Sequence, residues 1–219
     1  MTIEQPHASG LRERKKERTR ELIAETARRL FVERGFERVT IAEIAREAEV
    51  SQQTVFNYFP TKEDLVYYRL EAFEAELLDA VRSRSPGEPA LAAFARFVRA
   101  PRGLLARQDA DARERLAAVS RMISESPALL AREQQIFAGY TASLAALLAE
   151  EHGAAATDVE AWVAASAMMS VHRSLVAHAR RRVNDGVRHP RLAREVDAEA
   201  DRALALLERG LGGYAVKEG

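Results

Sequence analysis

Residues 40–62 constrain the fold more than any other stretch of the chain, because they predict two short helices joined by a tight turn. Thr40 is a suitable N-cap residue, and Glu43 in the first turn completes a capping box. Ser51 is suited to cap the second helix, which Pro60 then ends. Two helices joined in this way, the second short and polar on its outer side, are typical of a helix-turn-helix. The second helix of such a motif is narrow enough to enter the major groove of DNA.

The rest of the chain also predicts helices. No segment shows sustained alternation of apolar and polar side chains, so strands are not expected. The predicted fold class is therefore all-α, with about nine helices. These helices are expected to cover residues 12–34, 41–48, 51–58, 61–84, 89–100, 102–107 with 109–124, 127–151, 157–185 and 191–211.

The same pattern predicts three parts of the chain. Residues 1–10 lack periodicity and are expected to form a flexible N-terminal arm. Residues 11–60 are expected to form the helix-turn-helix domain, and residues 61–219 a larger helical domain. With 219 residues, of which 47 % are hydrophobic, the chain is able to build a core of that size.

Composition and motifs argue against several functional classes. The chain has no cysteine, which excludes disulfides, thiolate metal sites and a cysteine nucleophile. It also shows no nucleophile–base arrangement, metal-ligand spacing or glycine-rich phosphate loop, so we expect no catalytic site, metal or cofactor. The longest uncharged run, residues 134–149, is too short and too polar to span a bilayer, and the N-terminus has no apolar signal region. We therefore expect a cytoplasmic protein that does not enter a membrane.

Charge is distributed unevenly, although 33 basic and 33 acidic side chains give a formal net charge of zero. Residues 11–20 form a strongly basic segment, in which only Glu13 and Glu17 are acidic. Its basic side chains are Arg12, Arg14, Lys15, Lys16, Arg18 and Arg20. Such a run is often a solvated start of a helix, but beside a helix-turn-helix it favours contacts with DNA phosphates.

The second helix of the motif carries side chains that can read bases. Gln53 and Asn57 are expected on its outer side, with Gln52 at its N-terminal turn and Thr54 beside them. A Gln or Asn amide donates and accepts in one plane, so it can recognise the edge of adenine. The full set of expected DNA contacts is Arg12, Lys15, Lys16, Thr40, Ser51, Gln52, Gln53, Thr54, Asn57, Tyr58 and Lys62. The alternative is that these polar residues only solvate an exposed face.

The pattern in residues 11–70 resembles the DNA-binding region of the tetracycline repressor (TetR) family. The resemblance rests on Leu-Phe-Val-Glu-Arg-Gly-Phe at residues 30–36 and on Thr40, Ile44, Ala45, Val50, Ser51, Thr54, Phe56, Tyr58, Phe59 and Lys62. It implies a homodimeric transcription factor, more often a repressor, that binds a palindromic operator. It also implies a larger helical domain that binds a small effector and dimerises through the last two long helices, residues 157–185 and 191–211.

Two residues depart from the family pattern. Glu49 stands in the turn where the family usually has glycine, so it must adopt or avoid a positive φ at some cost. Phe56 stands where the family usually has tyrosine, and it lacks the hydroxyl that would bind a phosphate. We therefore expect Phe56 only to pack, while the hydroxyl of Tyr58 replaces the missing group.

Apolar and aromatic side chains in the larger domain are candidates for an effector pocket. They are Phe94, Phe97, Met122, Phe137, Tyr140, Trp162, Met169 and His172. If they line a cavity, the effector is expected to be largely apolar or aromatic. The alternative, which holds for most such residues, is that they only fill the core.

Three functions fit the sequence. The first is a ligand-responsive DNA-binding regulator. The second is a helical small-molecule-binding enzyme with an N-terminal interaction module, which lacks a recognisable catalytic arrangement. The third is an architectural DNA-binding protein without an effector, which the neutral net charge disfavours.

Overall fold

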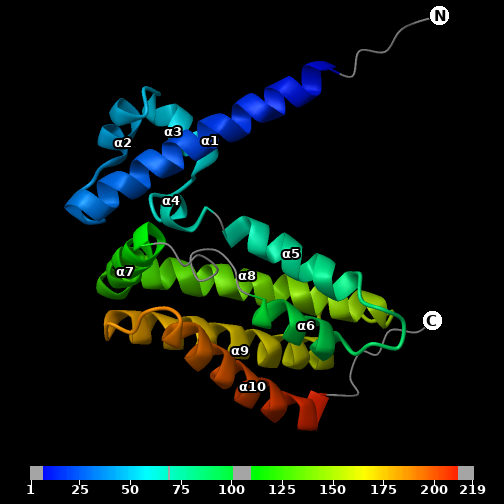
Figure 1. Ribbon diagram of the computed structural model, residues 1–219. Coiled ribbons are helices and arrows are strands. Elements are labelled where there is room, and N and C mark those ends of the chain that lie inside the picture. Colours follow the sequence, from blue (N-terminus) through cyan, green and yellow to red (C-terminus); the bar gives the residue numbers. More distant parts are fainter. Residues whose placement is uncertain (1–6, 69, 101–109, 212–219) are drawn as a thin grey trace, which may run out of the picture. The chain divides into compact units, whose positions relative to one another are not determined.

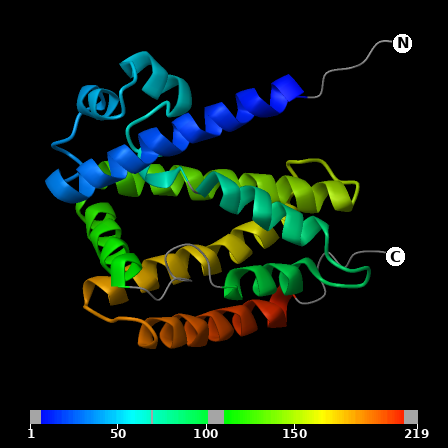
Figure 2. The ribbon, with the colours of Figure 1, turned by 45° about the horizontal axis from the view of Figure 1, so that its top comes forward.

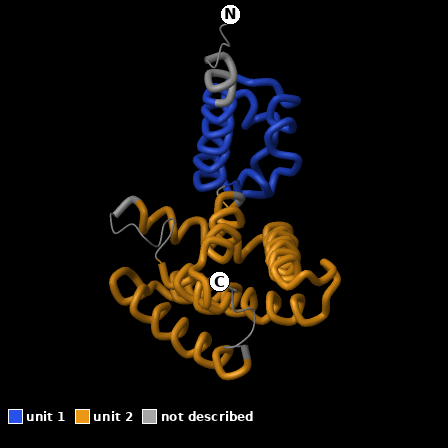
Figure 3. Tube along the Cα trace, turned by 90° about the vertical axis from the view of Figure 1, so that its right-hand side faces the viewer, with its two compact units in different colours: residues 1–68 blue, residues 69–219 orange. Residues whose placement is uncertain are grey.

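The computed structural model describes residues 7–68, 70–100 and 110–211 and divides into two compact units. Unit 1 is Met1–Tyr68 and unit 2 is Arg69–Gly219 (Figure 3). The described residues form ten α-helices and no strand, which confirms the all-α prediction.

Unit 1 consists of α1 (His7–Arg34), α2 (Ile41–Glu47), α3 (Gln52–Tyr58) and α4 (Asp64–Tyr67), shown in Figure 1. Helix α1 packs against α2 and α4, and α2 packs against α3. Side chains from all four helices and the connecting loop fill one core: Ile23, Leu30, Phe31, Ile44, Val55, Phe59 and Leu65 are each at most 2 % exposed. Burial of these apolar surfaces holds the short helices α2 and α3 in place, since helices of this length are marginal alone.

The ends of unit 1 differ from the sequence prediction in two places. Helix α1 already includes residues 7–10, which were assigned to the flexible arm, whereas residues 1–6 lie outside the described part. The helix expected over residues 61–84 is interrupted after Tyr67, so that α4 belongs to unit 1. The turn that leads into α4 is closed by Thr61 and Asp64, because the Thr61 N–H donates to Asp64 Oδ2 at 2.9 Å and the Asp64 N–H donates to Thr61 Oγ1 at 3.3 Å.

Unit 2 contains α5 (Leu70–Arg82), α6 (Ala90–Arg99), α7 (Ala110–Glu125), α8 (Pro127–Glu151), α9 (Val159–Asn184) and α10 (Arg191–Leu211). The long helices α8 and α9 lie side by side in its centre, with α5 and α6 along one side and α10 against α9 (Figures 1 and 2). Ser126 caps α8, which begins with Pro127, and Asp158 caps α9 by accepting the N–H of Ala161. The core of unit 2 includes the fully buried Phe94 and Met168.

Two of the ion pairs that join helices of unit 2 are largely shielded from solvent. Arg84 is 1 % exposed and binds Glu151 through two hydrogen bonds of 2.8 and 2.7 Å, which fix the end of α5 to the end of α8. Arg180 on α9 binds Glu133 on α8 through two hydrogen bonds, and both side chains are almost fully buried. Charges enclosed in this way stabilise only while both partners are present.

Glu49 is the only non-glycine residue with a positive φ (55°) among the described residues, so of the two possibilities left open by the sequence it adopts the strained one. It ends α2 in a Schellman motif, in which the Val50 N–H donates to the Ala45 carbonyl and the Glu49 N–H to the Arg46 carbonyl. Because a side chain is strained in this conformation, we expect Glu49→Gly to stabilise the protein by about 1 kcal/mol. Urea unfolding monitored by circular dichroism measures this change.

A matched control for this prediction lies in the same helix. Ala42 is exposed in α2, and Ala42→Gly is expected to destabilise the protein by about 1 kcal/mol, because glycine in a helix loses more backbone entropy on folding. If Glu49→Gly lowers the free energy of unfolding as Ala42→Gly does, the positive φ of Glu49 does not strain the wild type.

Candidate nucleic-acid interface

Helix α3 is anchored at its start and along its inner face. Ser51 caps it, because the Thr54 N–H donates to Ser51 Oγ at 3.0 Å and the two hydroxyl oxygens lie 2.8 Å apart. Val55 and Phe59 are buried in the core of unit 1. These contacts fix the rotation of α3 about its axis, and therefore determine which side chains face outward.

The outer face of α3 is formed by amides, as predicted. Gln52, Gln53 and Asn57 are exposed, and Thr54 is half-buried at the edge of the face. Gln53 Nε2 donates to Asn57 Oδ1 at 3.0 Å, which orders the two amides relative to each other. This bond uses one amide hydrogen of Gln53, so the pair keeps an acceptor and further donors for a base edge.

Phe56 also belongs to the outer face, contrary to the expectation that it packs. Its side chain is 45 % exposed. It follows Gln52 and Gln53 by four and three positions, the spacing at which helical side chains are neighbours. An exposed aromatic ring therefore stands among the amides.

Thr40 caps α2 through the predicted capping box. Its Oγ1 accepts from the Glu43 N–H at 3.2 Å and donates to Glu43 Oε2 at 2.9 Å, while the Thr40 N–H donates to the same oxygen at 2.8 Å. The hydrogen bonds from the Thr40 backbone and side chain lower the pKa of Glu43. The position expected to bind a phosphate thus already holds a carboxylate.

Lys62 packs on aromatic rings, a contact that sequence reasoning did not predict. Its Nζ lies 4.2 Å from the ring centroid of Phe36 and 5.9 Å from that of Phe31. Burial lowers the pKa of Lys62, because desolvation disfavours the ammonium. The cation is held at a defined place beside α3 and α4, whereas the neighbouring Tyr58 is half-buried.

The basic segment of α1 is helical and partly exposed. Lys15 and Lys16 are exposed, as expected for phosphate contacts, whereas the side chain of Arg12 lies outside the described residues. Arg20 is different, because its guanidinium packs 5.5 Å from the ring centroid of Phe59. Arg20 therefore contributes to the core of unit 1.

Residues 23–67 match the family model described as bacterial regulatory proteins, tetR family. Unit 1 belongs to the TetR family. The chain is 36 % identical over 98 residues to the HTH-type transcriptional regulator TcmR of Streptomyces glaucescens, a match that covers 45 % of this chain and 43 % of TcmR. It is 54 % identical over 44 residues to the HTH-type transcriptional regulator LuxR of Vibrio harveyi, covering 20 % of this chain and 22 % of LuxR. The chain thus spans less than half the length of these curated relatives.

Several solved structures share the fold over most of the chain, including unit 2. The SmeT–triclosan complex has a TM-score of 0.53 at 18 % identity, covering 86 % of this chain and 90 % of that one. GusR of Salmonella enterica has a TM-score of 0.51 at 20 % identity, and the match covers 89 % of this chain and 95 % of GusR. FadR of Bacillus subtilis, in complex with stearoyl-CoA, has a TM-score of 0.51 at 21 % identity, and the match covers 85 % of this chain and 96 % of FadR.

In unit 2, four of the predicted pocket residues come together around Phe73 of α5. Its ring lies 5.1 Å from Phe97, 5.4 Å from Tyr140 and 4.4 Å from His172, measured between centroids. Phe137 lies 5.5 Å from His172 in an edge-on arrangement. This aromatic cluster joins α5, α6, α8 and α9 in the middle of the unit.

The other predicted pocket residues do not belong to this aromatic cluster. Phe94 and Met169 are buried, and Met122 is half-buried on α7. Trp162 does not line an interior pocket, since its side chain is 38 % exposed and its Nε1 donates to the Ala156 carbonyl at 3.0 Å. Within the described ranges, no group of three or more His, Asp or Glu side chains is arranged to hold a metal ion, and no helix is both long and apolar enough to cross a membrane.

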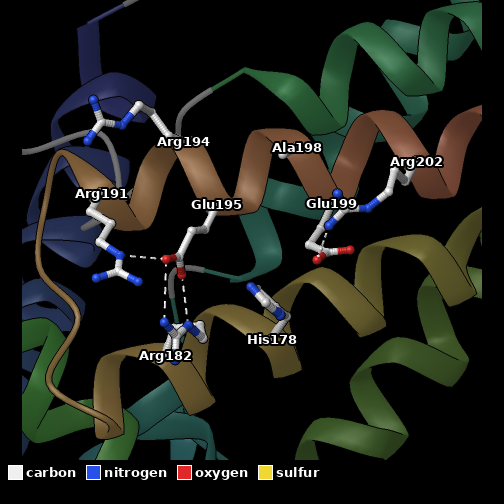
Figure 4. Close-up of a pocket in the computed structure, with 8 residues that line it drawn as sticks. All are labelled: His178, Arg182, Arg191, Arg194, Glu195, Ala198, Glu199 and Arg202. Carbon is white, nitrogen blue, oxygen red and sulfur yellow. Dashed lines mark hydrogen bonds and ion pairs between the residues drawn. The ribbon is translucent and has the colours of Figure 1, made fainter.

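A charged surface groove of about 410 Å³ lies between α9 and α10 (Figure 4). It is lined by His178, Arg182, Arg191, Arg194, Glu195, Ala198, Glu199 and Arg202. Glu195 accepts hydrogen bonds from Arg182 Nε and Arg191 Nε, each at 2.7 Å. These arginines lower the pKa of Glu195 from 4.5 to about 2.

The lowered pKa of Glu195 predicts a pH dependence of stability. Because the carboxylate is favoured in the folded state, its contribution is complete above the ordinary pKa of 4.5 and is lost as the pH falls towards about 2. We expect Glu195→Gln to unfold more easily than the wild type near neutral pH and equally near pH 2. Asp197→Asn, an exposed change on the same helix, is the control in acid-unfolding curves. A stability difference between wild type and Glu195→Gln that persists at the lowest pH would contradict this origin.

Proposed function

We propose that the protein is a ligand-responsive transcriptional regulator that binds operator DNA as a homodimer and acts as a repressor until an effector releases it. The observation that carries this proposal is α3 itself, which is capped, anchored by buried residues and covered with ordered amides on its exposed face. Such a helix placed in the major groove reads base edges. Its activity would lie in the cytoplasm, where bacterial DNA is found.

The DNA contacts divide into two kinds. Gln52, Gln53 and Asn57 read bases, and Thr54 reaches a phosphate or a thymine methyl at the edge of the groove. The phosphate contacts come from Lys62, Tyr58, the capped helix starts at Thr40 and Ser51, and the basic segment with Arg12, Lys15 and Lys16. Phosphate contacts fix the position of the domain, whereas base contacts select the sequence.

Exposed apolar residues on the last two long helices support dimerisation there. Val159, Trp162 and Val163 are 73, 38 and 59 % exposed and lie on one face at the start of α9. Leu206 on α10 is 64 % exposed. Covering these side chains with a second copy removes apolar surface from water. The two-fold symmetry of the dimer then requires a palindromic operator.

The aromatic cluster around Phe73 is the proposed effector site, and an apolar or aromatic effector suits its lining. The proteins of similar fold include SmeT, solved with triclosan, and FadR, solved with stearoyl-CoA. The effector would release DNA by binding more tightly to the conformation whose two α3 helices no longer match successive grooves. Its differential affinity sets the limit of that response.

Selection from random-sequence DNA tests the proposed function. We expect the wild type to enrich a palindromic site, and Gln53→Ala to lose preference at one position of each half-site, by about 1–3 kcal/mol. Gln134→Ala, an exposed glutamine on α8, is the control and is expected to keep the wild-type preference. Uniform binding to all sequences would support an architectural protein instead, and no binding at any salt concentration would support the enzyme with an interaction module.

Lys62→Met is expected to weaken binding to all sequences and to reduce the salt dependence by roughly one charge, because one phosphate contact is lost. Methionine keeps an apolar stem on Phe36, so the fold is preserved while the charge is removed. Fluorescence-anisotropy titrations at several salt concentrations measure the slope, with Arg209→Met on α10 as the charge-matched control. An unchanged slope for Lys62→Met would rule out the contact.

A further inference from the structure

We infer that Phe56 is a specificity-determining residue whose ring reads the methyl group of a thymine in the operator. The inference rests on the proposed DNA-binding function and adds one base contact that the amides do not supply. It starts from the position of the ring, which is 45 % exposed on the outer face of α3. Val55 inside α3 and Phe59 at its C-cap are both buried and fix the helix, so the ring of Phe56 is held outward.

The chemistry of the groove leaves few partners for this ring. Phe56 has no hydroxyl and so makes no hydrogen bond to a phosphate oxygen. The edges of the bases in the major groove present hydrogen-bond donors and acceptors, with one apolar group among them, the C5-methyl of thymine. An aromatic side chain brought into the groove therefore gains by covering that methyl and removing it from water.

The neighbours of Phe56 favour the same base pairs. Gln53 and Asn57, which are hydrogen bonded to each other at 3.0 Å, present the amides suited to adenine. Each adenine brings a paired thymine, whose methyl lies in the same groove. Because Phe56 is three positions after Gln53 and directly before Asn57, a helix that places its amides on adenine also places this ring near a thymine methyl.

Thymine-to-uracil replacement in the operator tests the contact, because it removes only the methyl group. The operator is first selected with the wild type, and each thymine is then replaced in turn. We expect one thymine of each half-site to be sensitive, with a loss of about fourfold in affinity, the effect of removing one buried methyl-sized group. In Phe56→Ala the unmodified operator binds more weakly, and uracil at that position causes no further loss, so the two changes are not additive.

Two further variants serve as controls for this combined test of the Phe56 ring and the thymine methyl group. Phe56→Leu retains an apolar side chain and is expected to retain part of the sensitivity to uracil. Val32→Ala truncates another exposed apolar residue of unit 1, 46 % exposed on α1, and is expected to change neither affinity nor uracil sensitivity. Because both wild-type side chains are exposed, thermal unfolding of the variants should stay close to wild type.

Specific results would overturn the inference. If Phe56→Ala weakens the thymine and uracil operators by the same factor at every position, the ring does not touch a methyl group. If no thymine is sensitive in the wild type, the contact is absent. Failure of the proposed function is distinct from both, since the wild type would then select no sequence at all.

Discussion

Replacing Phe59 with alanine is expected to unfold unit 1 and abolish binding to every DNA sequence. The ring is 1 % exposed, meets Tyr68 edge-on at 6.4 Å between centroids, and is covered by the guanidinium of Arg20. Truncating a buried phenylalanine costs about 3–5 kcal/mol, through lost burial and the cavity left behind. A unit that ends at Tyr68 has a small core and little stability to spare. Amide hydrogen exchange over α1–α4 and gel-shift titration measure the two effects.

Phe56→Ala is the matched control, because it makes the same change one helical turn earlier. Its ring is 45 % exposed, so hydrogen exchange in unit 1 should stay as in the wild type. The two variants therefore separate the side chain that holds α3 in place from the one that faces outward. Equal protection in Phe59→Ala and wild type would show that α3 does not depend on this anchor.

The second large effect is expected in unit 2, at Arg180. In the wild type the guanidinium of Arg180 binds the carboxylate of Glu133, with one hydrogen bond of 3.0 Å. Glu133 is only 8 % exposed, so Arg180→Ala leaves a buried carboxylate without this partner. Removing one partner of a buried pair costs about 3–5 kcal/mol. Because the pair joins the central helices α8 and α9, calorimetry should show the loss in the transition of unit 2.

Arg181→Ala provides the comparison, since the neighbouring arginine is exposed and the charge change is identical. Its effect is expected to be small. Replacing both Glu133 and Arg180 with leucine should recover much of the lost stability, because no charge is then left buried. If Arg180→Ala and Arg181→Ala behave alike, water rather than the partner satisfies Glu133.

Local features of the DNA-binding unit were predictable because neighbouring residues determine them. Thr40 with Glu43, and Ser51 with Thr54, are short-range pairs, and the sequence alone indicates their hydrogen bonds. The position of the turn at Glu49 was also predictable, whereas its positive φ became evident only from the structure. Each of these depends on residues within a few positions of one another.

Features that depend on contacts distant in the sequence were not predictable in this way. Lys62 packs on Phe36 only because the chain after α3 returns to the end of α1. The outward position of Phe56 depends on which side of α3 the core of unit 1 accepts.

The arrangement of the candidate effector site also depends on contacts between residues distant in the sequence. Four of the predicted side chains meet because α5, α6, α8 and α9 converge, which gives Phe73 its central place. The apolar stripes in the sequence identify which face of each helix is buried. They do not determine which helices pack against each other. Trp162 carries the same apolar signal and lies on the surface instead.

At the start of α2, the carboxylate of Glu43 already accepts the hydrogen bonds that Thr40 could offer to a DNA phosphate. A DNA phosphate that approaches Thr40 meets donors already bound to an anion, with hydrogen bonds of 2.8 and 2.9 Å to one oxygen of Glu43. Since Glu43 is part of the chain and stays beside Thr40, a phosphate at this position must compete with its carboxylate, so the proposed contact would add little net attraction.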